Sequence, residues 1–133
     1  MKHMILALAL GLSACGSDTE PVSCTGASCS CPAGASCDFT DSACGSSASC
    51  SLMCSNDNEC TGTCQESCSI DCSGGSTCNV TVGASGSVSC TGGSTCHVTC
   101  TGECSVSCSG STCDLKCPNQ AEAMQIPEGG SCQ

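Results

Sequence analysis

CSGGSTCNVTVGASGSVSCTGGSTC, residues 72–96, repeats itself and then departs from its own pattern. CSGGSTC returns as CTGGSTC, and in both copies two cysteines close a short loop rich in glycine and serine. The corresponding loop between the copies is VGASG, which has Val82 and Gly86 where two cysteines are expected. Because both cysteines are missing together, we infer that these two positions form a pair.

Five-residue units with an apolar centre extend the pattern along the chain. They are CSIDC, CNVTV, GSVSC, CHVTC, CSVSC and CDLKC, starting at residues 68, 78, 86, 96, 104 and 113, and the weaker CSLMC at 50 and CTGTC at 60. Small apolar and polar residues alternate within each unit, which is the periodicity of a β-strand. Gly, Ser and Thr between the units favour turns. The sequence therefore predicts an all-β protein of short strands.

One strand and one turn cannot bury a core alone, so we expect the units to stack into a small disulfide-rich β-solenoid with rungs of 8–10 residues. If each unit lies directly on the previous one, an aliphatic ladder runs up the inside between two cysteine columns. The first column contains Cys68, Cys78, Gly86, Cys96, Cys104 and Cys113, and the second Cys72, Val82, Cys90, Cys100, Cys108 and Cys117. The alternative is a low-complexity chain with random disulfides.

Strand geometry restricts how these cysteines pair. The two cysteines of one unit lie about 13 Å apart at the rise of a strand, whereas a disulfide needs Cα atoms within about 7 Å. Pairing across the turn between units is the hypothesis we favour, since it explains why VGASG lacks both partners. It gives the pairs Cys24–Cys29, Cys31–Cys37, Cys44–Cys50, Cys54–Cys60, Cys64–Cys68, Cys72–Cys78, Cys90–Cys96, Cys100–Cys104 and Cys108–Cys113. Cys117 and Cys132 remain, and we expect them to pair with each other and hold the C-terminal tail. Bridging between stacked rungs along a column is the rival scheme.

Composition excludes a conventional core. After residue 14 there are 119 residues (133 − 14), and Val, Ile, Leu, Met and Phe together number thirteen, with Phe39 the single aromatic. So few apolar side chains cannot offset an ordering cost of about 1–2 kcal/mol per residue. Lys116 is the only cation in this part against twelve acids, a net charge of −11 (1 − 12), so we expect no nucleic-acid partner.

The first residues indicate export. Lys2 and His3 precede a short apolar run, which is typical of a secretory signal. Leu12, Ser13, Ala14 and Cys15 resemble the lipobox of bacterial lipoproteins. The resemblance implies cleavage of residues 1–14, acylation of Cys15 with palmitate-type chains, and anchoring in a membrane. Gly16 after the cysteine favours the outer membrane or cell surface. The alternative is an ordinary signal peptide with Cys15 as a spare thiol.

We therefore expect a lipidated tether at 15–23, the solenoid at 24–117, and a C-terminal cap at 118–133 in which NQAEAMQ forms a helical turn or two. Residues 82–86 would be the least covalently restrained part of the stack.

Few residues suggest chemistry. His97, the only histidine after the signal, is expected to be a solvated surface residue, and SNDNE at 55–59 a solvated turn or weak calcium ligand. Nothing resembles a nucleophile with its base, so we expect no catalytic residue, no cofactor and no enzyme activity. Thiol-based metal binding, as in metallothioneins, is the alternative function, although only Cys29 and Cys31 form a CxC and no CxxC exists.

Hydroxyl side chains flank several inward cysteines. Thr99 and Thr101 would point outward beside Ser89 with Thr91 and Ser107 with Ser109. These steps resemble the TCT arrays of beetle antifreeze proteins, a resemblance that implies ice or polysaccharide binding. The function we expect first is a lipid-anchored envelope or surface protein with a structural, adhesion or display role. Its partners would be the membrane, through the lipid, and an unidentified surface or matrix component.

Overall fold

The computed structural model describes residues 20–24, 26–40 and 49–133. Throughout these ranges the regular structure is β, and no helix there is long and apolar enough to cross a membrane. The strands are β1 (Val22–Ser23), β2 (Ser28–Ser30), β3 (Ser36–Asp38), β4 (Cys50–Cys54), β5 (Glu59–Glu66), β6 (Cys68–Cys72), β7 (Thr77–Ala84), β8 (Gly86–Thr91), β9 (Thr95–Cys100), β10 (Cys104–Ser109), β11 (Thr112–Lys116), β12 (Met124–Gln125) and β13 (Gly129–Cys132).

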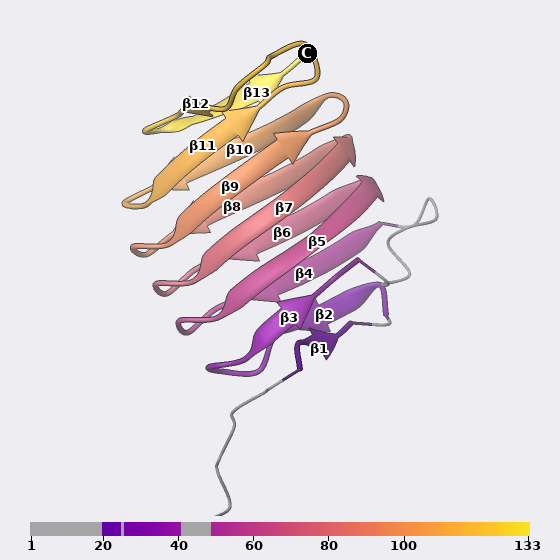
Figure 1. Ribbon diagram of the computed structural model, residues 1–133, viewed down its shortest axis with the longest axis vertical. Coiled ribbons are helices and arrows are strands. Elements are labelled where there is room, and N and C mark those ends of the chain that lie inside the picture. The colour runs from indigo at the N-terminus through magenta and orange to yellow at the C-terminus, as the bar shows by residue number, and fades with distance from the viewer. Residues whose placement is uncertain (1–19, 25, 41–48) are drawn as a thin grey trace, which may run out of the picture.

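These strands form two sheets that face each other (Figure 1). One sheet has the order β1-β3-β5-β7-β9-β11-β12 and the other β13-β10-β8-β6-β4-β2, so consecutive strands from β2 to β11 alternate between the sheets. From β1 to β11 every pairing is parallel. The chain therefore winds as a flattened, disulfide-rich β-solenoid of about 5 turns, and the predicted fold class is confirmed.

The expected stacking of each unit on the previous one is wrong. Ile70 pairs with Val88, and Val80 pairs with Val98, so like residues recur 18 positions apart and one coil takes two units (88 − 70). Each short turn reverses the chain, and a reversed neighbour in the same sheet would be antiparallel. Parallel ladders of like residues therefore form between every second unit, and each predicted cysteine column is divided between two sheets.

The core lies between the sheets and is thin. Residues of the six-stranded sheet alternate between buried and exposed along β4, β6 and β10. The inward aliphatic side chains are Leu52, Ile70, Val80, Val88, Val98, Val106 and Leu115, each at most 4% exposed. Phe39 is also buried, and it packs where Gly62 leaves room, since a β-carbon on Gly62 would lie 2.7 Å from that of Phe39. Buried cysteines fill the rest of the core.

Both ends of the stack differ from expectation. Val22–Ser23, expected in the tether, form β1 and pair with β3. The helical turn expected near residues 119–125 is wrong, because β12 pairs antiparallel with β11 and β13 pairs antiparallel with β10. The last strand of each sheet thus receives a hydrogen-bonded partner. Ile126, between these two strands, is 9% exposed and its amide donates to the carbonyl of Cys113 at 3.0 Å.

Candidate functional site

Disulfide bridges are the most frequent chemical feature of the described residues. Nine are present: Cys24–Cys29, Cys31–Cys37, Cys54–Cys60, Cys64–Cys68, Cys72–Cys78, Cys90–Cys96, Cys100–Cys104, Cys108–Cys113 and Cys117–Cys132. Eight of them join the partners that pairing across turns requires, and the ninth, Cys117–Cys132, joins the two cysteines that this rule left over. Cys44, the partner expected for Cys50, and Cys15, the expected lipidation site, lie outside the described residues.

The bridges stack along the two long edges of the solenoid. At the edge formed by the glycine-rich turns, Cys54, Cys72, Cys90 and Cys108 are in register on one sheet, and Cys60, Cys78, Cys96 and Cys113 on the other. Neighbouring bridges are close: the sulfurs of Cys72, Cys90 and Cys96 all lie within 4.8 Å of one another, as do those of Cys54, Cys60 and Cys78. Each coil is therefore cross-linked at its own turn, and the disulfides of successive coils form a continuous column along this edge.

The oxidation state of the cysteines decides whether they can bind metals as thiolates, as the metallothionein-like alternative requires. Thiolates bind soft metals, and disulfide sulfurs do not present that ligand. The nineteen cysteines of the described ranges are all disulfide-bonded. Metal binding of the metallothionein type would therefore require reduction first.

VGASG replaces a bridge with a packed pair of residues. Val82 lies in register between Cys64 and Cys100 and is fully buried, and Gly86 is in register with Cys104. A β-carbon on Gly86 would lie 2.0 Å from Cγ1 of Val82. The valine side chain thus occupies the space into which a residue-86 side chain would project. This contact explains why both cysteines are absent together.

Threonine ladders cover the outer face of the seven-stranded sheet. Thr77, Thr95 and Thr112 are in register, and a second ladder four residues further along contains Thr63, Thr81 and Thr99. The expected grouping of Thr99 with Ser89 and Ser107 is wrong, because those serines belong to the other sheet. Alternation of consecutive units between sheets separates them, so the threonine face combines residues that are 17 or 18 positions apart.

Serines cover the outer face of the six-stranded sheet. Ser28, Ser51, Ser69, Ser87, Ser105 and Ser131 form one ladder across all six strands. The adjacent ladder contains Asp71, Ser89 and Ser107. A shallow groove of about 250 Å³ runs between the two ladders over β6, β8 and β10. Over these strands the face offers hydroxyl groups and one carboxylate at the strand spacing of about 4.8 Å, and on β4 the exposed side chain of Met53 lies in register with Asp71.

His97 has a partner that sequence reasoning missed. Its Nδ1 lies 2.6 Å from Oδ2 of Asp114, and the side chains are 49% and 29% exposed. The residues are directly opposite on β9 and β11, in an outward ladder that also contains Asn79. At this exposure the pair contributes little to stability, but it orients the imidazole. The pair of His97 and Asp114 could have been found in the sequence by comparing positions about 18 residues apart.

Asp38 lies at the N-terminal end of the same sheet. The hydroxyl and amide of Thr40 donate hydrogen bonds to its carboxylate and lower its pKa. Hydrogen bonding favours the charged form of a carboxylate.

SNDNE is a structural turn that stacks on the SGGS turn of the next coil. Asn56 and Asp57 adopt the left-handed backbone conformation that Gly74 and Gly75 adopt in that coil. Asn58 points inward and is 2% exposed; its side chain accepts from the amide of Ala35 and donates to the carbonyl of Cys31. The amide oxygen of Asn58 is therefore already engaged within the fold.

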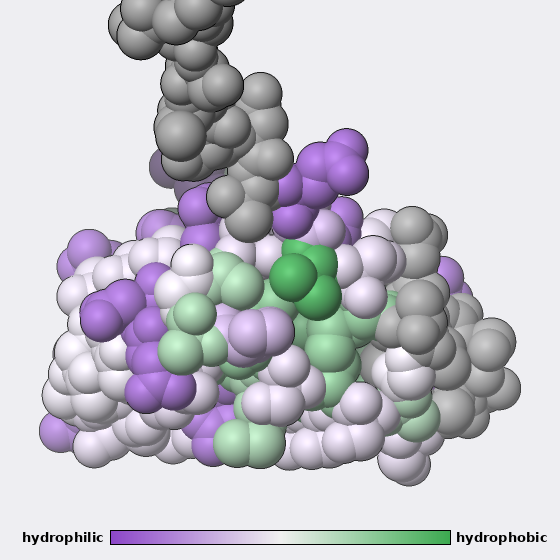
Figure 2. Space-filling view, turned by 90° about the horizontal axis from the view of Figure 1, so that it is seen from below, coloured by the Kyte–Doolittle hydropathy of each residue, from purple (hydrophilic) through white to green (hydrophobic). Residues whose placement is uncertain are grey.

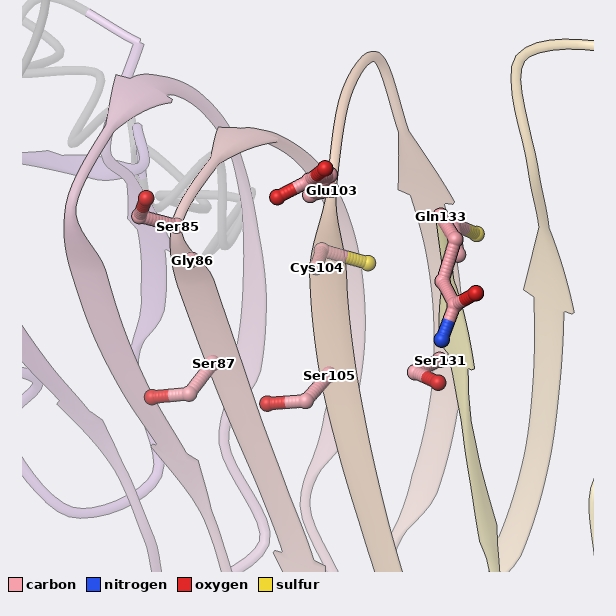
Figure 3. A pocket seen from close by; sticks show the side chains of 9 residues that line it. Ser85, Gly86, Ser87, Glu103, Cys104, Ser105, Ser131 and Gln133 are labelled. Carbon is pink, nitrogen blue, oxygen red and sulfur yellow. The ribbon is translucent and has the colours of Figure 1, made fainter.

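A cavity that is wide open to solvent lies at the C-terminal end, beside β8, β10 and β13 (Figure 3). It measures about 460 Å³ and is lined by Ser85, Gly86, Ser87, Glu103, Cys104, Ser105, Ser131, Cys132 and Gln133. The opposite end, viewed in Figure 2, has apolar residues surrounded by polar ones, and Val22 there is 41% exposed.

No family model, curated protein or solved structure matches the chain.

Proposed function

We propose that this chain is an exported, lipid-anchored protein of the outer membrane or cell surface, with a structural, adhesion or display role. The observation that carries the proposal is the pair of disulfide columns along the solenoid edges. Disulfides persist in oxidising compartments outside the cytoplasm, which supports export. Each described bridge with a separation of 4 to 6 residues stabilises its own turn, so stiffness is distributed along the stack.

The proposed anchor is close to the solenoid. Val22, at the start of β1, lies seven positions after Cys15, a distance of at most about 25 Å for an extended chain. A lipid on Cys15 would therefore hold the end carrying β1 near the membrane. The serine and threonine faces would then be presented to the surroundings.

The anchor is tested by metabolic labelling in a bacterial host with radioactive palmitate. The wild-type chain is expected to incorporate label and to sediment with membranes. The matched variant Cys15→Ser should do neither while still forming its disulfides. Equal labelling of both chains, or soluble wild-type protein, would contradict the anchor.

Display at the surface is tested with a short epitope inserted between Gly110 and Ser111. This turn is a suitable site because a β-carbon on Gly110 would have no atom within 4 Å. We expect an antibody to label intact cells that express the anchored chain. Labelling that appears only after the outer membrane is permeabilised would place the chain on the inner face and refute surface display.

Ice or polysaccharide binding by the threonine face is a second candidate. Two registered threonine ladders on one sheet favour it, since they give a periodic array of hydroxyl and methyl groups. The test measures thermal hysteresis and glycan-array binding for Thr95→Lys, with Ser87→Lys on the other sheet as the matched control. Activity lost only in the Thr95 variant would support this function, and no activity in the wild type would reject it.

The metal-binding alternative is tested by counting thiols in the purified, unfolded protein. If the chain is the disulfide-bonded surface protein proposed above, it should have no reactive thiol other than an unacylated Cys15, and no bound metal. Ten or more reactive thiols with bound zinc or copper would favour the alternative.

A further inference from the structure

Two disulfides meet at the C-terminal end of the solenoid. Cys100–Cys104 closes the turn between β9 and β10, and Cys117–Cys132 holds β13 to the end of β11. Cys132 lies directly opposite Cys104 in the antiparallel pairing of β13 with β10. The sulfurs of Cys100, Cys104 and Cys132 all lie within 4.8 Å of one another. Figure 3 shows the Cys104 side chain directed toward the strand that carries Ser131 and Gln133.

This pair of bridges also offers access to solvent. Among the described cysteines only Cys29 and Cys117 are partly exposed, whereas Cys100, Cys104 and Cys132 are 1%, 6% and 4% exposed. The cavity of about 460 Å³ has Cys104 and Cys132 in its wall. Cys117 is therefore the member of these two bridges that lies nearest the solvent, and Cys104, although it borders the cavity, is 6% exposed.

We propose that these two bridges form a thiol–disulfide exchange site whose substrate is a small external thiol. The thiolate attacks the sulfur of Cys117, a mixed disulfide forms there, and the Cys117–Cys132 bond breaks with Cys132 leaving as a thiolate. The Cys132 thiolate then attacks Cys104, a Cys104–Cys132 bond forms, the Cys100–Cys104 bond breaks, and Cys100 leaves as a thiolate. The number of disulfides is conserved, since the external thiol becomes one half of a mixed disulfide.

The exchange changes how the end of the solenoid is fastened. In the starting state Cys132 of β13 is bonded to Cys117, the residue that directly follows β11. After exchange it is tied to its hydrogen-bonded neighbour β10, and the turn between β9 and β10 has lost its bridge. The external thiol remains attached to Cys117 as a mixed disulfide. A protein that has met such a thiol therefore differs covalently from one that has not. This proposal does not depend on the lipid anchor or on any ligand of the outer faces.

A single protease site makes the exchange measurable. Lys116 is the only Lys or Arg after residue 2, so trypsin separates the 17-residue peptide 117–133 (133 − 116) from the preceding chain. The oxidised full chain is treated with limiting glutathione, alkylated with N-ethylmaleimide, unfolded in urea and cleaved. In the untreated protein the Cys117–Cys132 bridge lies within that peptide, so the peptide is released.

After glutathione treatment we expect loss of the free peptide. It should remain joined to the core through Cys104–Cys132, with glutathione on Cys117 and N-ethylmaleimide on Cys100. Release of a peptide carrying N-ethylmaleimide on Cys132 would overturn the proposal, and so would attachment through any cysteine other than Cys104.

A pair of variants tests the same transfer without an external thiol. Cys117→Ser leaves Cys132 without its partner, and we expect the free thiol to be found on Cys100 with the peptide retained by Cys104–Cys132. Cys29→Ser is the matched control, because Cys24 is in none of the described three-sulfur clusters, and its free thiol should stay on Cys24. A free thiol on Cys132 in the first variant would refute the exchange. If Cys117→Ser does not fold, the glutathione titration of the wild type decides alone.

Discussion

Replacing both Val82 and Gly86 by cysteine should restore the bridge that VGASG lacks. The two neighbouring bridges at the same edge, Cys64–Cys68 and Cys100–Cys104, have Cα separations of 6.3 and 6.1 Å, and Val82 lies in register between two of their cysteines. Positions 82 and 86 have the same sequence separation as those pairs. The backbone therefore already has the geometry of a disulfide, and the substitution of Val82 removes the methyl group that blocks a side chain at 86.

The magnitude follows from loop closure. A bridge across a five-residue loop lowers the entropy of the unfolded chain by an amount worth about 2 kcal/mol at 25 °C. The two new sulfurs replace the volume of the lost valine methyls, so we expect little cavity cost. For a domain of this size, about 2 kcal/mol corresponds to a rise of roughly 10 °C in the melting temperature.

The single variants provide the controls. Gly86→Cys alone places a β-carbon 2.0 Å from Cγ1 of Val82, and overpacking of this kind costs about 1–3 kcal/mol. Val82→Cys alone leaves one thiol and a small cavity. Thermal unfolding followed by circular dichroism gives the stabilities, and alkylation with mass spectrometry gives the free thiols. A double variant that is less stable than the wild type, or whose two thiols can be alkylated, would refute the interpretation of this turn.

Three further predictions concern stability. Reduction of all disulfides should abolish the β signal in circular dichroism, because thirteen large apolar residues cannot order the chain; an unchanged spectrum would contradict this. Gly62→Ala should destabilise the fold by about 2–3 kcal/mol, since its β-carbon would overlap Phe39 and its φ is 154°, while Gly26→Ala, with ordinary contacts, should unfold at the wild-type temperature. Asn58→Ala should cost about 1–3 kcal/mol in urea unfolding, because the buried carbonyl of Cys31 loses its donor, while the amide of Ala35 keeps its hydrogen bond to the carbonyl of Pro32; a change below about 0.5 kcal/mol would show that water replaces the lost amide.

The local features of this protein can be predicted from its amino-acid sequence. Alternation within CSIDC and CSVSC indicates strands, strand rise excludes bridges within a unit, and the joint loss of the cysteines at 82 and 86 favours pairing across turns, where both partners lie within a few residues of each other. The joint absence of cysteines at positions 82 and 86 could also be interpreted from the sequence, because the two residues that contact each other are only four positions apart. Lipidation at Cys15 stays a prediction from the sequence.

Which strands are neighbours could not be predicted from the sequence and is seen in the folded chain. A parallel ladder can form between any strands that share a direction, and the interior of a five-residue unit looks the same whichever unit lies above it. Chain reversal at each short turn selects every second strand, which no single unit reveals. That selection puts Thr77 beside Thr95 and His97 beside Asp114, and the antiparallel return of β13 along β10 puts Cys132 beside Cys104. The outer faces and the exchange site therefore arise from the winding of the whole chain, whereas the strands and their bridges arise from its local pattern.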